Sequence, residues 1–325
     1  MFKFGNFEIN NKVVLAPMAG ITSSGYRKFM ASFGPGYMVT EMVSDMGLIY
    51  GNEETKTYVE FAKEEMPVGV QLFGNSPENF AKAALICENL NPNIDFYDIN
   101  MGCPVPKVTK TGAGSNLMTN PTLCGEIVRV VKEATHKPVS VKIRLGFYNS
   151  ELNYLEVIKS VLAAGVDLIA IHPRSAKEMY GGKPHWDLIK NLKKEVNVPL
   201  VVSGNIYTVE DAKNALEITG ADAVMIARGG IGNPRLISNI NKYFNGEEFE
   251  HPTLMEQVEY CKQLAQLLIE EKGEAKAMRV YRGIATKFFD GFPNSKALKC
   301  RLSTELITYS DLISILNDYL SNIEL

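Results

Sequence analysis

Short apolar runs recur through the first two thirds of the chain, and most are followed by a stretch with the apolar spacing of a helix. Eight runs have the continuous apolar character of parallel strands that are buried on both faces. We predict strands at residues 13–17, 37–40, 68–73, 96–100, 139–144, 168–172, 200–204 and 223–227. Between them we predict helices at residues 22–33, 76–90, 121–134, 153–164, 186–195 and 208–219.

This alternation of eight strands with helices favours an α/β fold of the (β/α)8 TIM barrel type. A doubly wound open sheet is the structural alternative. After residue 240 the strand-like runs disappear, and we predict helices at 254–271, 274–289 and 311–321, with a break at 291–293. We therefore expect a TIM barrel over residues 1–240 and a C-terminal small all-helical domain over residues 241–325.

Composition indicates in which compartment the protein works. The chain has 325 residues, of which 46% are hydrophobic and 22% charged, a normal globular range. No apolar stretch approaches the roughly 18 residues that a membrane span needs, and the N-terminus lacks the apolar core of a signal peptide. Five cysteines without a CxxC pair fit reduced thiols. We expect a cytoplasmic monomer without a membrane partner.

Charge is distributed unevenly. The net charge is −3, yet residues 276–301 contain seven basic side chains and one acid, Asp290. This segment indicates a local surface for RNA, although a solvated helix face would look the same. Tyr281, Phe288 and Phe289 lie among these charges at a spacing that also fits a helix core. The four histidines are scattered without HxH or HExxH spacing, so we expect no metal site.

Polar residues stand at the carboxyl ends of nearly all the predicted strands, the ends that form the active-site mouth of a TIM barrel. The groups are Ala16–Gly20, Glu41, Gln71, Asn100 with Cys103, Lys142 with Arg144, His172 with Arg174, Ser203–Asn205 and Ala227–Gly230. The loops after the last two strands are the usual phosphate cradle of this fold, and Arg228 adds a positive charge there. Together these groups predict a flavin mononucleotide (FMN) site.

Single residues in this set also have structural explanations. Cys103 lies in a tight Gly-Cys-Pro turn, which suits either a reactive thiol or an inert loop residue. Lys142 interrupts an apolar strand, where a buried ammonium needs a partner, so a functional role is favoured. His172 and Gln71 fit a structural role equally well. No Walker or dinucleotide glycine motif is present, since Gly34-Pro-Gly36 lacks the required context.

Several segments resemble the tRNA-dihydrouridine synthase family. They are Ala16–Thr22, Gln71–Gly74, Asp98–Pro104, Lys107 with Ala113–Ser115, Val141–Gly146, Ile171–Ser175 and Trp186-Asp187. The segment around Cys103 is the most specific, and the resemblance thins over the helical tail. Where the family usually has Asn-Gly-Asp, this chain has Ser203-Gly204-Asn205, which removes a carboxylate near the expected cofactor.

The resemblance implies reduction of particular tRNA uridines to 5,6-dihydrouridine, with NADPH as electron donor and FMN as cofactor. Cys103 would be the general acid, because a thiol near its ordinary pKa is protonated at neutral pH. The target base would have to leave its stack. FMN would be held by Pro17, Met18, Ala19, Gln71, Lys142, His172, Ser203, Gly204, Asn205, Ala227, Arg228 and Gly229. The tRNA would contact Asn100 and Arg174 at the uracil edge, and Lys107, Arg279, Arg282 and Lys287 elsewhere.

Two other functions are compatible with the barrel. One is an FMN-dependent TIM-barrel oxidoreductase that acts on a free small molecule, which activity on free uracil would indicate. The other is an RNA-binding protein that has lost redox chemistry, which a protein unable to take up FMN would indicate. The basic segment argues against the first, and the intact set of Cys103, Lys142 and His172 argues against the second.

Overall fold

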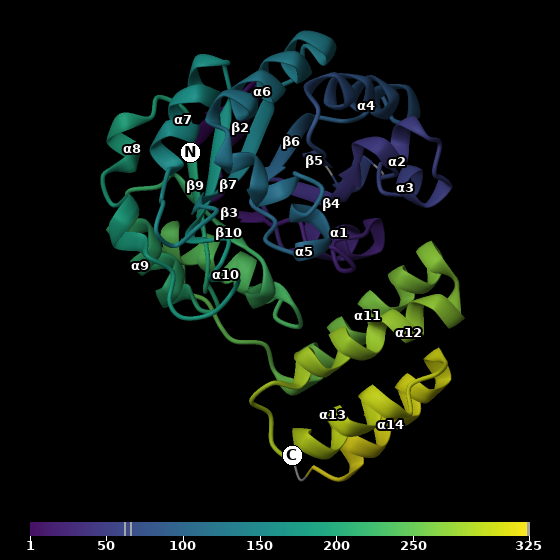
Figure 1. The fold of residues 1–325 in the computed structure, drawn as a ribbon. Helices are drawn as coiled ribbons and strands as arrows, with labels where there is room; N and C mark the ends of the chain where they lie inside the picture. Colours follow the sequence, from purple (N-terminus) through teal and green to yellow (C-terminus); the bar gives the residue numbers. More distant parts are fainter. Residues whose placement is uncertain (62, 66, 324–325) are drawn as a thin grey trace.

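The computed structural model describes residues 1–61, 63–65 and 67–323. Eight parallel strands close into a barrel in the order β10-β3-β4-β5-β6-β7-β8-β9 (Figure 1). They are β3 (Val13–Leu15), β4 (Met38–Ser44), β5 (Val68–Phe73), β6 (Phe96–Met101), β7 (Val139–Gly146), β8 (Leu168–Ser175), β9 (Leu200–Ser203) and β10 (Ala223–Ile226). The predicted TIM barrel is confirmed, and the open sheet is wrong.

Three strands run further than the sequence pattern indicated. β4, β7 and β8 continue past residues 40, 144 and 172 by two to four residues. The pairing register shifts between Val39 and Met42, and again between Arg144 and Gly146. A bulge of this kind lets a strand continue while it interrupts the sequence pattern. The extensions matter for function, because they carry side chains further toward the mouth.

Helices form the outer layer around the barrel (Figure 1). They are α1 (Ser24–Ala31), α2 (Asp45–Ile49), α3 (Glu53–Thr57), α4 (Pro77–Leu90), α5 (Pro106–Thr109), α6 (Pro121–Thr135), α7 (Tyr154–Ala163), α8 (Leu192–Glu195), α9 (Val209–Thr219) and α10 (Arg235–Phe244). Ser76, Asn120 and Thr208 each cap the next helix by accepting a backbone N–H. The single helix predicted at 186–195 is wrong. A 3₁₀ turn at Trp186–Ile189 precedes α8, and residues 190 and 191 form a turn between them.

A hairpin that the sequence did not predict closes the amino-terminal end of the barrel. Its strands β1 (Phe2–Phe4) and β2 (Phe7–Ile9) are too short to produce a pattern. The Phe4 ring contacts Phe96 at 4.7 Å and Tyr37 at 5.8 Å between centroids. Phe96 in turn lies over Gly69, where a Cβ would be 2.1 Å from the ring. This end of the barrel is therefore filled with side chains.

The chain then forms a helical region, as predicted, of α11 (Leu254–Lys272), α12 (Glu274–Ala285), α13 (Ser295–Thr304) and α14 (Tyr309–Ser321) (Figure 1). α13 was not predicted, and the α-helix expected to reach residue 289 ends at Ala285 and continues as a 3₁₀ turn, Thr286–Phe289. Tyr281, Phe288 and Phe289 are buried, so their spacing reflects the core. Within the described residues, no helix combines the length and apolar character that crossing a membrane requires.

The boundary expected at residue 240 falls inside α10. This helix is attached to the barrel through Asn241, whose amide donates to the Gly34 carbonyl at 2.9 Å and accepts from Lys12 N at 3.1 Å. We therefore place the start of the helical domain in the connection between α10 and α11. α11 returns to the barrel, since Tyr260 packs on Phe33 at 5.2 Å between ring centroids.

Candidate active site

A cavity of about 440 Å³ opens at the carboxyl ends of the barrel strands. This volume is within the range of small-molecule sites. Every barrel strand, or the loop directly after it, contributes to the wall. The residues that the sequence assigned to the flavin all line it, together with Cys103 and the predicted uracil contact Asn100: Pro17, Met18, Ala19, Gln71, Lys142, His172, Ser203, Gly204, Asn205, Ala227, Arg228 and Gly229.

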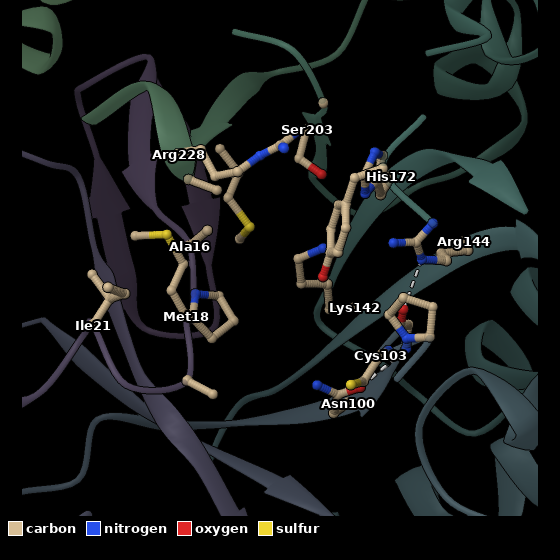
Figure 2. Close-up of a pocket in the computed structure, with 18 of the residues that line it drawn as sticks. Ala16, Met18, Ile21, Asn100, Cys103, Lys142, Arg144, His172, Ser203 and Arg228 are labelled. Atoms are coloured by element: carbon tan, nitrogen blue, oxygen red, sulfur yellow. Dashed lines mark hydrogen bonds between the residues drawn. The ribbon is translucent and has the colours of Figure 1, made fainter. Parts of the chain in front are cut away.

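Figure 2 shows how the walls face one another. Met18 and Ile21 lie on one side, and His172 and Arg144 lie on the other. Asn100 and Cys103 occupy one end of the hollow, whereas Ser203 and Arg228 lie at the opposite end. The thiol and the phosphate-type loops are therefore at opposite ends of one cavity.

The turn that carries Cys103 is held from inside the barrel. Asn100 Oδ1 accepts the backbone N–H of Cys103 at 2.9 Å and that of Gly102 at 3.2 Å. On the other side of the turn, Ser115 donates its N–H and its hydroxyl to the Cys103 carbonyl at 3.0 and 2.9 Å. Gly114 approaches so closely that a Cβ there would lie 2.8 Å from that carbonyl oxygen. The turn therefore has one defined position.

Asn100 is itself the end of a buried hydrogen-bond chain. The Ser140 hydroxyl donates to Asp98 Oδ1 at 2.5 Å, and Gln71 Nε2 donates to Asp98 Oδ2 at 2.5 Å. Gln71 Oε1 then accepts from Asn100 Nδ2 at 2.8 Å. Because a carboxylate can only accept, the chain fixes which end of each amide is the donor. One N–H of Gln71 remains available to a ligand.

The Cys103 thiol is half-buried in the wall. Burial raises its pKa above the ordinary value, and this effect outweighs the N–H of Val105 and the charges of Arg144 and Lys142, which lower it. A raised pKa keeps the thiol protonated at neutral pH. The site is therefore suited to a thiol that gives up a proton and less suited to a thiolate nucleophile.

Lys142 brings a positive charge into the same wall. Burial, together with the charge of Arg144, lowers its pKa to about 8, although Asp98 and Cys103 act in the opposite direction. A buried ammonium is costly unless a negative charge accompanies it. The site consequently favours an anionic ligand beside Lys142.

His172 is fixed in its neutral form. Arg174 Nη1 lies 2.8 Å from His172 Nε2, and a guanidinium can only donate, so Nε2 is the acceptor and Nδ1 carries the proton. Burial lowers the pKa of His172 well below its usual value, assisted by the charges of Lys142, Arg144, Arg174 and Arg228.

The sequence did not assign a role to Arg144 or identify Tyr180, and both line the cavity. Arg144 Nε donates to the Gly102 carbonyl, and Nη1 donates to the carbonyls of Ser175 and Met179, each at 2.8 Å. Arg144 thus connects the Cys103 turn to the loop after β8. Tyr180 in that loop has its ring 5.4 Å from the Arg144 guanidinium carbon. In the sequence, Tyr180 could have been found only as a tyrosine followed by Gly-Gly after a barrel strand, and that pattern is a weak sign of a site residue.

The two loops at the opposite end approach each other closely. Gly204 has φ 114° and Asn205 has φ 51°, values that glycine and asparagine adopt more readily than other residues. A Cβ on Gly229 would lie 2.0 Å from the Ile206 carbonyl oxygen, so the loops after β9 and β10 touch. Asn205 Oδ1 accepts from Arg174 Nη2 at 3.1 Å, so a neutral amide binds Arg174 at the position where the family usually has a carboxylate.

The remaining substrate residues expected from the sequence lie outside this cavity. Arg174 is fully buried, and its other donors go to the carbonyls of Gly181 and Gly182. Lys107 and Arg279 are exposed on α5 and α12, and Arg282 donates to the Leu306 carbonyl. Lys287 lines a second cavity nearby.

Comparison with known proteins identifies the family. The profile described as dihydrouridine synthase (Dus) matches residues 14–322. The chain belongs to the dihydrouridine synthase family. It is 33% identical over 297 residues to a probable tRNA-dihydrouridine synthase of Rickettsia conorii, covering 91% of this chain and 89% of that protein. It is also 33% identical to tRNA-dihydrouridine synthase B of Pasteurella multocida, over 90% of this chain and 88% of the relative.

A probable tRNA-dihydrouridine synthase of Aquifex aeolicus is 35% identical over 90% of this chain and 91% of its own. Among solved structures, a 2-naphthoyl-CoA reductase matches with a TM-score of 0.56 at 15% identity, over 75% of this chain and 51% of that chain. Histamine dehydrogenase from Rhizobium sp. 4-9 matches with a TM-score of 0.57 at 14% identity, over 98% of this chain and 64% of that chain. At these identities the solved structures support the barrel fold of this dihydrouridine synthase and no more.

Proposed function

We propose that this dihydrouridine synthase reduces the C5–C6 double bond of specific uridines in tRNA, with FMN as cofactor, NADPH as electron donor and Cys103 as general acid. The observation that carries the proposal is the Cys103 turn, which Asn100 holds through the backbone in the wall of a cavity that also contains Lys142, and where burial raises the pKa of the thiol. The relatives that match over nine tenths of the chain are named for this reaction on tRNA.

The residues present fit FMN. The loops at 203–205 and 227–229, with Arg228 beside them, offer backbone N–H groups and a charge for a phosphate. Gln71 has one free N–H for a ring edge, because its other polar atoms are already bonded. The lowered pKa of Lys142 indicates a cavity that lacks a negative charge, which an electron-rich ring or a phosphate would supply.

When bound, the reduced flavin supplies a hydride to C6 of the uracil. Cys103 then donates its proton to C5, so one hydride and one proton saturate the double bond, and the thiolate regains a proton from solvent. Arg144 and Lys142 lower the pKa of Cys103, and so stabilise the thiolate that this step produces. His172, neutral because Arg174 occupies its Nε2, keeps Nδ1–H as a donor.

The uracil edge requires a partner other than Arg174, whose donors go to His172, Asn205, Gly181 and Gly182. Asn100 is committed as well, because its Oδ1 holds the Cys103 turn and its Nδ2 donates to Gln71 and Met42. We assign this role to Arg144, which lines the cavity together with Cys103. Lys107, Arg279 and Arg282 remain candidates for the tRNA backbone outside the cavity.

The decisive experiment compares wild-type protein with Cys103→Ala. We expect both to bind FMN and to be reduced by NADPH, whereas dihydrouridine formation in tRNA from cells lacking the protein falls at least 100-fold in the variant. Turnover by Cys103→Ala at the wild-type rate would exclude the thiol as the acid. A wild-type protein that reduces free uracil as well as tRNA would instead favour a small-molecule oxidoreductase.

A further inference from the structure

Glu41 is a buried carboxylate to which the proposed reaction assigns no role. It lies on β4 in the bulge between Val39 and Met42, and it is 6% exposed. Its neighbour Met42 lines the active-site cavity, whereas Glu41 itself does not. A buried carboxylate lowers stability unless hydrogen bonds or positive charges compensate for it, so this position indicates a specific contact.

The contact is with the loop between β3 and α1. Glu41 Oε2 accepts the backbone N–H of Gly20 at 2.5 Å. Burial raises the pKa of Glu41, and this N–H is the strongest of the groups that lower it. Gly20 is exposed and has φ 76°, a left-handed shape that glycine adopts readily. The bond to Glu41 therefore fixes a residue that packing of its own side chain cannot hold.

Thr22 connects this anchor to the wall of the cavity. Its hydroxyl accepts the N–H of Met18 at 2.9 Å and donates to the Met18 carbonyl at 3.2 Å. The backbone N–H groups of Ile21 and Thr22 also donate to that carbonyl, both at 3.0 Å. Met18 and Ile21 form one side of the cavity, opposite His172 (Figure 2). A displacement of Gly20 would therefore move this side of the cavity.

The helical domain holds the chain directly after this loop. Glu271, at the end of α11, accepts the Ser23 hydroxyl at 2.8 Å and the Gly25 N–H at 3.0 Å. A Cβ on Gly25 would lie 2.8 Å from both Glu271 Oε2 and the Leu267 carbonyl oxygen, so α1 and α11 are in close contact. The start of α1 is thus fixed separately, and the bond to Glu41 acts on the loop that precedes it.

We propose that Glu41 is a positioning residue of the flavin site, because by holding Gly20 it sets where Met18 and Ile21 lie in the cavity to which we assign FMN. The inference rests on the proposed function. A loop that is already in place binds a ligand more tightly than a loop that must be ordered on binding. The role requires an acceptor at this position, which a glutamine can also supply.

The first test compares Glu41→Ala with Asp95→Ala by the Kd for FMN, measured by fluorescence in full-length protein stripped of the flavin. Asp95 is half-buried and accepts the Val68 N–H at 2.8 Å, so it makes the same kind of bond at the amino-terminal end of β5. We expect Glu41→Ala to raise the Kd about 10-fold, because a hydrogen bond to a charged acceptor is lost. Asp95→Ala should lower the melting temperature and keep the wild-type Kd. Glu41→Gln should stay within about 3-fold of wild type, because its Oε1 can accept the same N–H.

The second test leaves the carboxylate in place and changes the loop. A Cβ on Gly20 would meet open space among the described residues, so Gly20→Ala strains the backbone without a clash. Gly51→Ala is the matched control, since Gly51 has φ 70°, equally open surroundings and no place in the active-site cavity. We expect Gly20→Ala to raise the Kd for FMN about 5- to 10-fold, because alanine disfavours the left-handed shape. Gly51→Ala should bind FMN as the wild type does.

Three results would overturn the inference. The first is a wild-type Kd for FMN in Glu41→Ala, and the second is an equal rise in Asp95→Ala, which would make the effect one of general stability. The third is a Kd in Glu41→Gln as high as that in Glu41→Ala. If Glu41→Ala does not fold, the comparison of Gly20→Ala with Gly51→Ala decides, and equal Kd values overturn the inference. If the wild-type protein takes up no FMN, the proposed function itself fails.

Discussion

Replacing Asn100 with alanine tests whether the barrel core positions the Cys103 thiol. The change removes the acceptor of the Gly102 and Cys103 N–H groups and the donor to Gln71 Oε1. Gly102 and Gln71 are buried, whereas Cys103 is half-buried and can be hydrated. Each buried polar group left unpaired costs about 1–3 kcal/mol, so for the two groups we expect the free energy of unfolding to fall by about 2–6 kcal/mol.

The effect of Asn100→Ala on the rate of dihydrouridine formation should exceed its effect on stability. The thiol must be within reach of C5 of the uracil, and a displacement on the order of 1 Å costs about 100-fold in rate. We therefore expect Asn100→Ala to bind FMN and accept electrons from NADPH, yet to form dihydrouridine about 100-fold more slowly at a temperature where it is fully folded. Single-turnover oxidation of the reduced enzyme by tRNA measures this step directly.

Asn75→Ala is the matched control. Asn75 is exposed and donates a single hydrogen bond to the Thr111 carbonyl at 2.6 Å, outside the chain that leads to the thiol. This variant should lose less than about 1 kcal/mol and keep its rate. If Asn100→Ala matched the control in both melting and single-turnover rate, the hydrogen-bond chain would not be what positions Cys103.

Three further outcomes follow from the site. The Lys142 ammonium has a pKa of about 8 in the free protein and loses its proton as pH rises, so FMN affinity should weaken between pH 7 and 9.5. Lys142→Arg should remove this pH dependence. A wild-type affinity that stays constant over this range in a fluorescence titration contradicts the prediction. The raised pKa of Cys103 keeps the acid form through pH 8.5, so the rate of flavin oxidation by tRNA should stay level to that pH, and a decline centred below pH 8 would show another group to be the acid. Gly229→Ala forces a Cβ against the Ile206 carbonyl and should release FMN. The control Gly283→Ala, in α12 with open space around it, should keep FMN. Equal flavin content of the two variants after gel filtration would refute the role of the close-packed loop in holding FMN.

The sequence predicted the barrel because parallel strands buried on both faces leave a strong signal, and the closed fold then places all their carboxyl ends together. Lys142 and His172 were predictable for this reason, since each is a polar residue that interrupts an apolar strand. Cys103 was predictable from a turn motif directly after β6. These predictions required only the position of a residue along a strand.

The sequence could not show contacts that depend on how the loops meet in the folded chain. Arg174 has the same strand-end position as the others, yet it points to the Gly181 and Gly182 carbonyls of its own loop, which no sequence pattern encodes. Tyr180 enters the site because Arg144 binds the Met179 carbonyl beside it. Nor did the sequence indicate what Glu41 binds, because the carboxylate acquires its partner only when the loop before α1 brings the Gly20 N–H to β4.

The position of the Cys103 thiol depends on residues of the barrel strands rather than on contacts between loops. A thiol on a surface loop would be held by loop contacts alone and would move with them. Here the amide of Asn100, a β6 residue, binds the turn, and its orientation is set through Gln71 on β5 and Asp98, which Ser140 on β7 also holds. Three adjacent strands therefore determine where Cys103 lies. For the proposed role of Cys103 as the acid, a thiol positioned by strands is what a reaction on a flipped base requires, because the proton must be delivered to one atom whichever tRNA presents it.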